Sequence, residues 1–206
     1  MTPLESLFKD HHQAAQYARA YVDNLIVILK GLDHEAVTGI IGVFEQVYRR
    51  KGRIYFAGNG GSASTCGHFV NDLHAGSLRH GGGGFRLMDL TSNIAALTAL
   101  ANDIGYEDVF LKQLEGIIEP GDALVVISAS GNSKNLIKAV DYAKSQGVDT
   151  VGLLGFDGGE LKLLCDMALI VSTPPGQYGP VEDIHLMVNH LISTYFTFCK
   201  KNSRLL

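Results

Sequence analysis

The stretch RIYFAGNGGSASTCGHFVND, residues 53–72, decides the fold. It opens with a short apolar run, passes through small residues between Gly58 and Ser62, and continues as a helical pattern. A buried strand, a Gly-rich turn and a helix make the first half of a βαβ unit. The free N–H groups and the dipole at such a helix N-terminus favour an anion, so the turn predicts a phosphate site at the end of a parallel strand.

The rest of the chain repeats this alternation. Four more apolar runs predict strands at 85–90, 123–130, 150–156 and 167–173. Helical patterns occupy residues 5–32, 33–52, 64–78, 92–103, 106–118, 132–147 and 180–201. Strands that alternate with helices indicate an α/β fold with a five-stranded parallel sheet flanked by helices on both faces. We expect a single domain over 1–206, with N-terminal helices at about 4–50 and an α/β core at about 53–196.

Composition narrows the class of protein. The 206 residues are 46% hydrophobic and 18% charged, with a net charge of −4 and no basic run, which argues against nucleic acid as a partner. No apolar stretch reaches the roughly 20 residues of a membrane span, and the first residues lack the pattern of a secretory signal. The three cysteines form no CxxC pair. We therefore expect a reduced, cytoplasmic protein with no membrane partner.

A second loop of small residues resembles the first. Ser128 to Ser133 follows the strand ALVVI and precedes a helix, as Gly58 to Ser62 does. Neither loop contains the lysine of a nucleotide-hydrolysing P-loop. Ser62 and Ser133 could serve only as helix caps, but two such loops on one sheet favour phosphate binding. The first loop also matches a dinucleotide fingerprint weakly, with Asp89 as the acid that would hold a ribose.

Ionisable side chains follow these loops. His68 and Asp72 are four residues apart and share one face of a helix, a spacing that suits two ligands of one metal ion or a plain structural contact. The last helix carries Glu182 and His190, eight residues apart on a largely apolar segment. His190 could instead be a buried, hydrogen-bonded core residue, and we expect His185 to be structural.

These motifs together resemble the sugar isomerase (SIS) domain family. The resemblance is carried by AGNGGSAS, GHFVNDL, LTALANDIGYEDVF, GDALVVISASGNSKNLIKAV, TVGLLGFDGG and VEDIHLMVNH, and is strongest to the phosphoheptose isomerase subfamily, whose substrate is sedoheptulose 7-phosphate. It implies a cytoplasmic aldose–ketose isomerase that supplies nucleotide-activated heptoses for surface polysaccharide. It also implies a homotetramer with active sites between subunits.

The resemblance assigns roles to residues. It places the substrate-binding positions at Asn59, Gly60, Gly61, Ser62, Asn102, Asp103, Ser128, Ala129, Ser130, Ser133 and Glu182, and the metal ligands, for Zn²⁺, at His68, Asp72, Glu182 and His190. Three of these depart from the family pattern: Ala129 replaces Thr, Asp72 replaces a Glu that is both ligand and base, and Glu182 replaces Gln.

A carboxylate and an imidazole suit an isomerisation through an enediol, which needs a base and then an acid near neutral pH. We assign Asp72 and His190 as this catalytic pair, with the phosphate of the substrate held in the serine loop. Because Asp is one methylene shorter than Glu, the reach of Asp72 differs from that of the family's base. The alternative is a non-catalytic SIS module that binds a phosphosugar or another protein without turnover.

Overall fold

The structure is a computed structural model that describes residues 3–78 and 84–202. Within these residues, parallel strands form one five-stranded sheet in the order β2-β1-β3-β4-β5. The strands are β1 (Arg53–Gly58), β2 (Arg86–Asp89), β3 (Ala123–Ser128), β4 (Asp149–Gly155) and β5 (Met167–Val171). This confirms the predicted fold class, and all five strands lie within the ranges expected from the apolar runs or within one residue of them. β1 pairs with both β2 and β3, so the two loops that follow β1 and β3 lie side by side.

Successive residues of the central strands face opposite sides of the sheet. Ile54 and Phe56 of β1 belong to one apolar cluster, and Tyr55 and Ala57 belong to the other. Every residue of β3 is buried. Strands covered on both faces read as continuous apolar runs, which is why the sequence pattern located them.

Helices cover both faces of the sheet. The first cluster is completed by α3 (His34–Arg50), α4 (Gly61–Leu78) and α9 (Tyr178–Lys201). The second is completed by α5 (Ile94–Asp103), α6 (Val109–Leu114), α7 (Lys134–Ser145) and α8 (Leu161–Leu164), with the 3-10 helix η1 (Tyr106–Asp108) between α5 and α6. The Asp33 carboxylate caps α3 by accepting hydrogen bonds from the N–H groups of Glu35 and Ala36. Among the described residues, no helix combines the length and apolar character needed to cross a bilayer.

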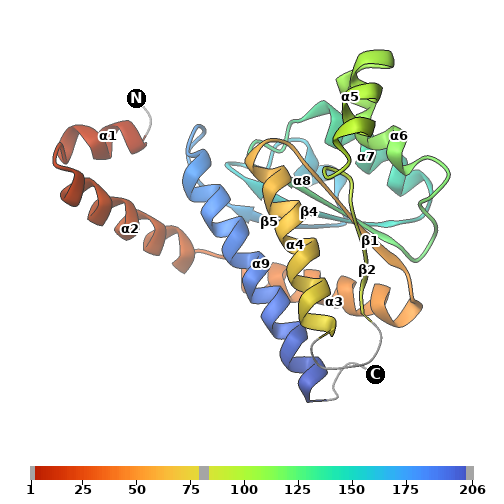
Figure 1. Ribbon diagram of the computed structural model, residues 1–206. Helices are drawn as coiled ribbons and strands as arrows, with labels where there is room; N and C mark the ends of the chain where they lie inside the picture. Colours follow the sequence, from red (N-terminus) through yellow and green to blue (C-terminus); the bar gives the residue numbers. More distant parts are fainter. Residues whose placement is uncertain (1–2, 79–83, 203–206) are drawn as a thin grey trace.

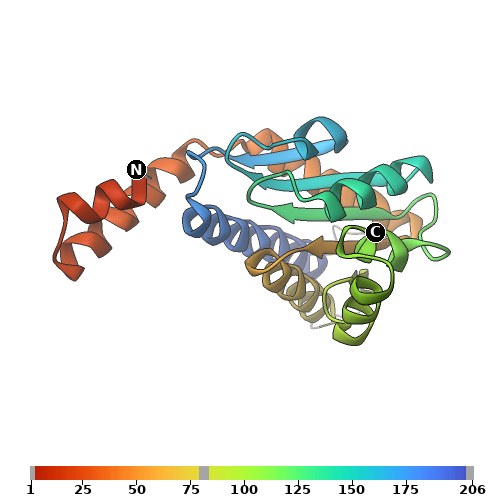
Figure 2. The ribbon, with the colours of Figure 1, turned by 90° about the horizontal axis from the view of Figure 1, so that it is seen from above.

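The N-terminal segment differs from its prediction. The sequence predicts one helix over 5–32, but the structure has two, α1 (Pro3–Asp10) and α2 (Ala14–Lys30), so that prediction is wrong at the break. Gln13 adopts extended backbone before α2, although neither Gly nor Pro marks the position, and the rings of Phe8 and Tyr17 then meet edge to face at 6.0 Å. Helix α2 buries no residue in this chain and projects with α1 away from the α/β body (Figures 1 and 2).

Candidate active site

Helices α4 and α9 lie side by side, and both begin near the carboxyl edge of the sheet (Figures 1 and 2). Glycines on α4 allow the close approach. A Cβ atom on Gly61 would collide with the carboxylate of Glu182, and one on Gly76 would collide with the hydroxyl of Thr197. The two helices therefore run in the same direction and stay in contact over most of their length, so residues at matching levels can share a site.

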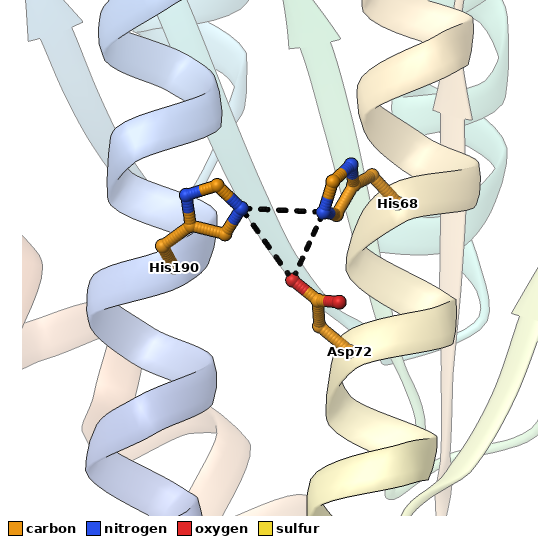
Figure 3. A group of neighbouring side chains, drawn as sticks. All are labelled: His68, Asp72 and His190. Carbon is orange, nitrogen blue, oxygen red and sulfur yellow. Dashed lines mark hydrogen bonds and ion pairs between the residues drawn. The ribbon is translucent and has the colours of Figure 1, made fainter.

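Midway along this pair, His68 and Asp72 of α4 meet His190 of α9 (Figure 3). Nε2 of His68 lies 3.2 Å from Asp72 Oδ2 and 3.2 Å from Nε2 of His190, and the His190 nitrogen lies 3.7 Å from the same carboxylate oxygen. The side chains of His68 and His190 are 42% and 53% exposed. The interpretation of His190 as a buried core residue is therefore wrong, and the three side chains face solvent together.

The spacing of these three atoms fits a metal ion. Ligand atoms around tetrahedral Zn²⁺ at about 2.0–2.1 Å stand roughly 3.3 Å apart, close to the 3.2, 3.2 and 3.7 Å found here. The two imidazole nitrogens and the carboxylate oxygen are also the atom types that Zn²⁺ prefers. Among the described residues, this is the group of His, Cys, Asp and Glu side chains whose ligand atoms lie close enough together to hold a metal ion.

Glu182 is placed elsewhere. Its carboxylate lies against Gly61 at the start of α4, and it does not join the group of His68, Asp72 and His190. Eight residues separate Glu182 from His190, about 12 Å along the helix axis. The structure thus brings together three of the four predicted metal ligands, and Glu182 as a ligand stays a prediction.

A hollow of about 210 Å³ opens where β1, β3 and α9 meet. Residues from all three predicted segments line it, namely Asn59, Ser62, Ser128, Ala129, Ser130, Ser133 and Glu182, together with Ile127 and Tyr178. Gly60 and Gly61 lie in the same turn, between Asn59 and Ser62. The N-termini of α4 and α7 both border this hollow, so free N–H groups and two helix dipoles favour an anion there.

The serine loop holds its own backbone in place. The Ser128 hydroxyl accepts a hydrogen bond from the N–H of Gly131 at 3.1 Å, and the Ser130 hydroxyl accepts one from the N–H of Asn132 at 3.3 Å. Gly131 has a φ of +66°, and a Cβ there would collide with the carbonyl of Gly158, so the turn requires glycine. The loop around Gly131 is thus held by its own hydrogen bonds, and the side chains of Ser128 and Ser130 line the hollow.

The capping interpretation of the two serines finds no support. Ser133 occupies the N-cap position of α7 but makes no side-chain capping hydrogen bond. Ser62 is the second residue of α4, inside the helix, and is buried. Both hydroxyls border the hollow, where a ligand would meet them.

Two residues that the sequence did not single out join the loops. The side-chain amides of Asn59 and Asn135 exchange hydrogen bonds of 3.0 and 2.9 Å, and the Tyr106 hydroxyl donates to Asn59 Oδ1 at 2.7 Å. Asn135 is buried at the start of α7, where its neighbours toward the sheet are apolar. In the sequence, Asn135 is visible only as a lone amide on an apolar helix face, and this pattern does not predict which residue it contacts.

Asn102 and Asp103 do not line the hollow. They end α5, are exposed, and hydrogen bond to each other at 2.8 Å. The segment that follows them does reach the site, because Tyr106 contacts Asn59. Their contact with the sugar stays a prediction.

Asp89 and His185 have structural partners. Asp89 Oδ1 accepts hydrogen bonds from the N–H and the hydroxyl of Thr91 at 2.8 and 2.6 Å, so this carboxylate oxygen holds the turn that follows β2. His185 is fully buried, and its Nε2 lies 3.1 Å from the carbonyl oxygen of Leu154. The expectation that His185 is structural agrees with this placement.

Comparison with known proteins identifies the family. The SIS domain model matches residues 17–155. The phosphoheptose isomerase of Helicobacter pylori strain Shi470 is 42% identical over 147 residues, which cover 71% of this chain and 75% of that protein. The phosphoheptose isomerase of Helicobacter pylori strain ATCC 700392 / 26695 is 39% identical over 173 residues, which cover 84% of this chain and 88% of that protein.

A solved structure agrees with these sequence matches. The phosphoheptose isomerase of Neisseria gonorrhoeae superposes with a TM-score of 0.79 at 27% identity, covering 89% of this chain and 98% of that one. The structural likeness thus covers most of this chain and nearly all of that one. The chain therefore belongs to the SIS domain family, and within that family to the phosphoheptose isomerases.

Proposed function

We propose that this chain is an aldose–ketose isomerase that interconverts sedoheptulose 7-phosphate and glycero-manno-heptose 7-phosphate for nucleotide-heptose and surface polysaccharide synthesis. One observation carries the proposal: a hollow lined by serines and the His68–Asp72–His190 group lie at two levels of the same pair of helices. The two relatives that are 42% and 39% identical to this chain are phosphoheptose isomerases.

The spacing of the two levels suits a phosphosugar. From Ser62 to His68 is about 9 Å along the axis of α4, and from Glu182 to His190 about 12 Å along α9. With its phosphate in the serine hollow, an extended seven-carbon sugar can place its carbonyl end beside the His–Asp–His group. Binding of the distant phosphate then orients the reacting carbons without taking part in the reaction.

The chain's own side chains would move the protons. Asp72 as the base would take a proton from C1, the hydroxyl-bearing carbon beside the C2 carbonyl, which leaves an enediolate. A proton then passes from O1 to O2, and protonated His190 gives a proton to C2, so that the aldehyde forms at C1. The two groups are 3.7 Å apart, so both can reach adjacent carbons of one substrate. Asn59, held by Asn135 and Tyr106, and Glu182 line the same hollow as the serines and are available to bind the substrate beside its phosphate.

The fit of the three ligand atoms supports Zn²⁺ as the cofactor. His68 and Asp72 would hold it, together with His190 where its Nε2 is not the protonated acid, and with Glu182 as a proposed fourth ligand. A bound Zn²⁺ ion would polarise the substrate carbonyl and so make the neighbouring C–H more acidic.

We also propose a cytoplasmic homotetramer with sites between subunits. Apolar residues on the projecting helix α2 support association, because the side chains of Val22, Ile26 and Val27 are 52%, 44% and 71% exposed in the single chain. On α9, Tyr195 and Phe198 are also exposed, beyond His190 along the helix. A partner subunit over these faces would border the His–Asp–His group.

The activity is tested by NMR. The protein, with and without added Zn²⁺, is incubated with sedoheptulose 7-phosphate and with a panel of five- and six-carbon ketose phosphates, in ordinary water and in D₂O. We expect signals of the heptose 7-phosphate aldose, together with deuterium at the carbon beside the carbonyl, because an enediol exchanges that proton with solvent. Binding of the phosphosugar with neither turnover nor exchange would instead support the non-catalytic module.

The serine loop gives a separate prediction. Ser130→Ala and Ser133→Ala should each weaken phosphosugar binding by about 1–3 kcal/mol, the range for a lost hydrogen bond to a charged group. Calorimetric titration measures the affinity, and thermal melting checks the fold. Ser145→Ala, at the other end of α7, is the matched control. Unchanged affinity in a folded double variant would show that these hydroxyls do not bind the phosphate.

A further inference from the structure

A buried amide contacts the Asp72 carboxylate from behind. Asn189 precedes His190 on α9 and is 0% exposed. Its Nδ2 donates a hydrogen bond of 3.1 Å to Asp72 Oδ2, the same oxygen that faces Nε2 of His68 and of His190. The amide therefore contacts the one carboxylate oxygen that is placed to bind a metal ion.

The orientation of this amide follows from its partners. An ionised carboxylate only accepts hydrogen bonds, so the NH₂ group of Asn189 has to face Asp72. Its carbonyl oxygen then faces Ser193, whose hydroxyl donates to it at 3.0 Å. Ser193 is itself buried. The result is a directed chain of hydrogen bonds from Ser193 through Asn189 to Asp72.

Packing alone does not explain an amide at this position. Its neighbours toward the core, Val188 and Ile192, are buried apolar residues of the first cluster. Burying an amide is unfavourable unless its hydrogen bonds are made, and an apolar side chain would fill the same space without that requirement. The polar atoms of Asn189 are directed at one functional carboxylate and one hydroxyl.

We propose that Asn189, oriented by Ser193, is a positioning residue that holds Asp72 Oδ2 between the two imidazoles and thereby sets the affinity of the site for a divalent cation. The inference rests on the metal site of the proposed function. Partners behind a metal ligand typically change metal affinity 10–100-fold.

The test measures Zn²⁺ affinity by competition with a chromophoric chelator. Asn189→Leu keeps the volume but removes the donor, and we expect a 10–100-fold weaker affinity. Ser193→Ala leaves the donor in place but frees the amide to rotate, so a smaller loss in the same direction is expected. This milder variant also keeps the test valid if Asn189→Leu fails to fold.

Asn71 provides the matched control. Its exposed amide contacts the other carboxylate oxygen, Asp72 Oδ1, at a longer 3.4 Å, so Asn71→Leu should leave Zn²⁺ affinity within threefold of the parent. His68→Ala, which removes a ligand, should abolish the tight site. Co²⁺ substitution gives a second readout, because its visible absorption reports the ligand geometry and should change in Asn189→Leu but not in Asn71→Leu.

The outcomes separate this inference from the function. If folded Asn189→Leu and Ser193→Ala bind Zn²⁺ as the parent does while His68→Ala does not, the metal site stands and the role of Asn189 is wrong. If the parent itself binds no Zn²⁺, the inference falls with the metal site. The NMR assay then decides separately whether the protein still isomerises the sugar.

Discussion

His190→Gln should reduce isomerisation of sedoheptulose 7-phosphate more than 100-fold while the protein stays folded. A general acid or base typically contributes about 10²–10⁴-fold, and glutamine can neither donate nor accept a proton near neutral pH. The side chain of His190 is 53% exposed, so its replacement removes little packing. Phosphosugar binding should survive, because the serine hollow lies at the other level of the helix pair.

Turnover, calorimetric binding and thermal melting are measured on the same preparation. His34→Gln, which removes an exposed imidazole from α3, is the control for loss of a histidine as such. A variant that melts normally and turns over within threefold of the parent would contradict both the catalytic and the metal role of His190. If the parent's own turnover proved negligible, the non-catalytic module would become the better description.

Metal content separates the two roles of His190. If the variant loses Zn²⁺ and excess Zn²⁺ restores turnover, the imidazole acts mainly as a ligand. If the variant keeps its Zn²⁺ and stays inactive, the imidazole acts in proton transfer. The 3.2 Å contact with His68 and the 3.7 Å contact with Asp72 allow either role, so this measurement decides between them.

The central strands of the sheet could be predicted from the sequence because they are buried on both faces. A run such as Ala123–Ser128 has no solvent-facing side, so its apolar character is continuous and its ends are sharp. The N-terminal segment could not be predicted in the same way. Its helices bury little within the chain, and neither Gly nor Pro marks the break near Gln13, across which the rings of Phe8 and Tyr17 meet.

In the site, too, the contacts within one helix could be predicted, and the contacts between helices could not. The spacing of His68 and Asp72 follows from helix geometry alone, and the structure does place them together. Whether His190 and Glu182 join them depends on how α9 packs against α4. The structure places His190 with them and the Glu182 carboxylate against Gly61. Asn135 and Asn189 escaped notice because a single amide on an apolar helix face carries no sign of the partner that satisfies it.

The stability of the protein should also depend on a histidine that takes no part in the reaction. His185 Nε2 faces the carbonyl of Leu154, which can only accept, so Nε2 carries the proton and Nδ1 is bare. Nδ1 is buried without a hydrogen-bond partner. Burial lowers the pKa of His185 from 6.5 to about 4, and the bond to Leu154 opposes this only in part. Protonation would place a charge and an unpaired N–H in the core.

The pKa difference makes the folded state sensitive to acid. Between pH 6.5 and 4 the unfolded chain binds a proton at residue 185 that the folded chain does not bind, so the free energy of unfolding falls as the pH falls. The contribution of His185 to the free energy of unfolding is fully present above pH 6.5. At 1.36 kcal/mol per pKa unit, about 3 kcal/mol of it is lost by pH 4.

Denaturant unfolding of the parent and of His185→Gln is measured across this range. The two proteins share every other ionisable group, so the difference between the two curves isolates residue 185. Gln can still donate to Leu154 but cannot be protonated, so its curve should be flatter by about 3 kcal/mol, with His34→Gln as the matched exposed control. Parallel curves for parent and His185→Gln would show that the buried imidazole is not what limits stability in acid.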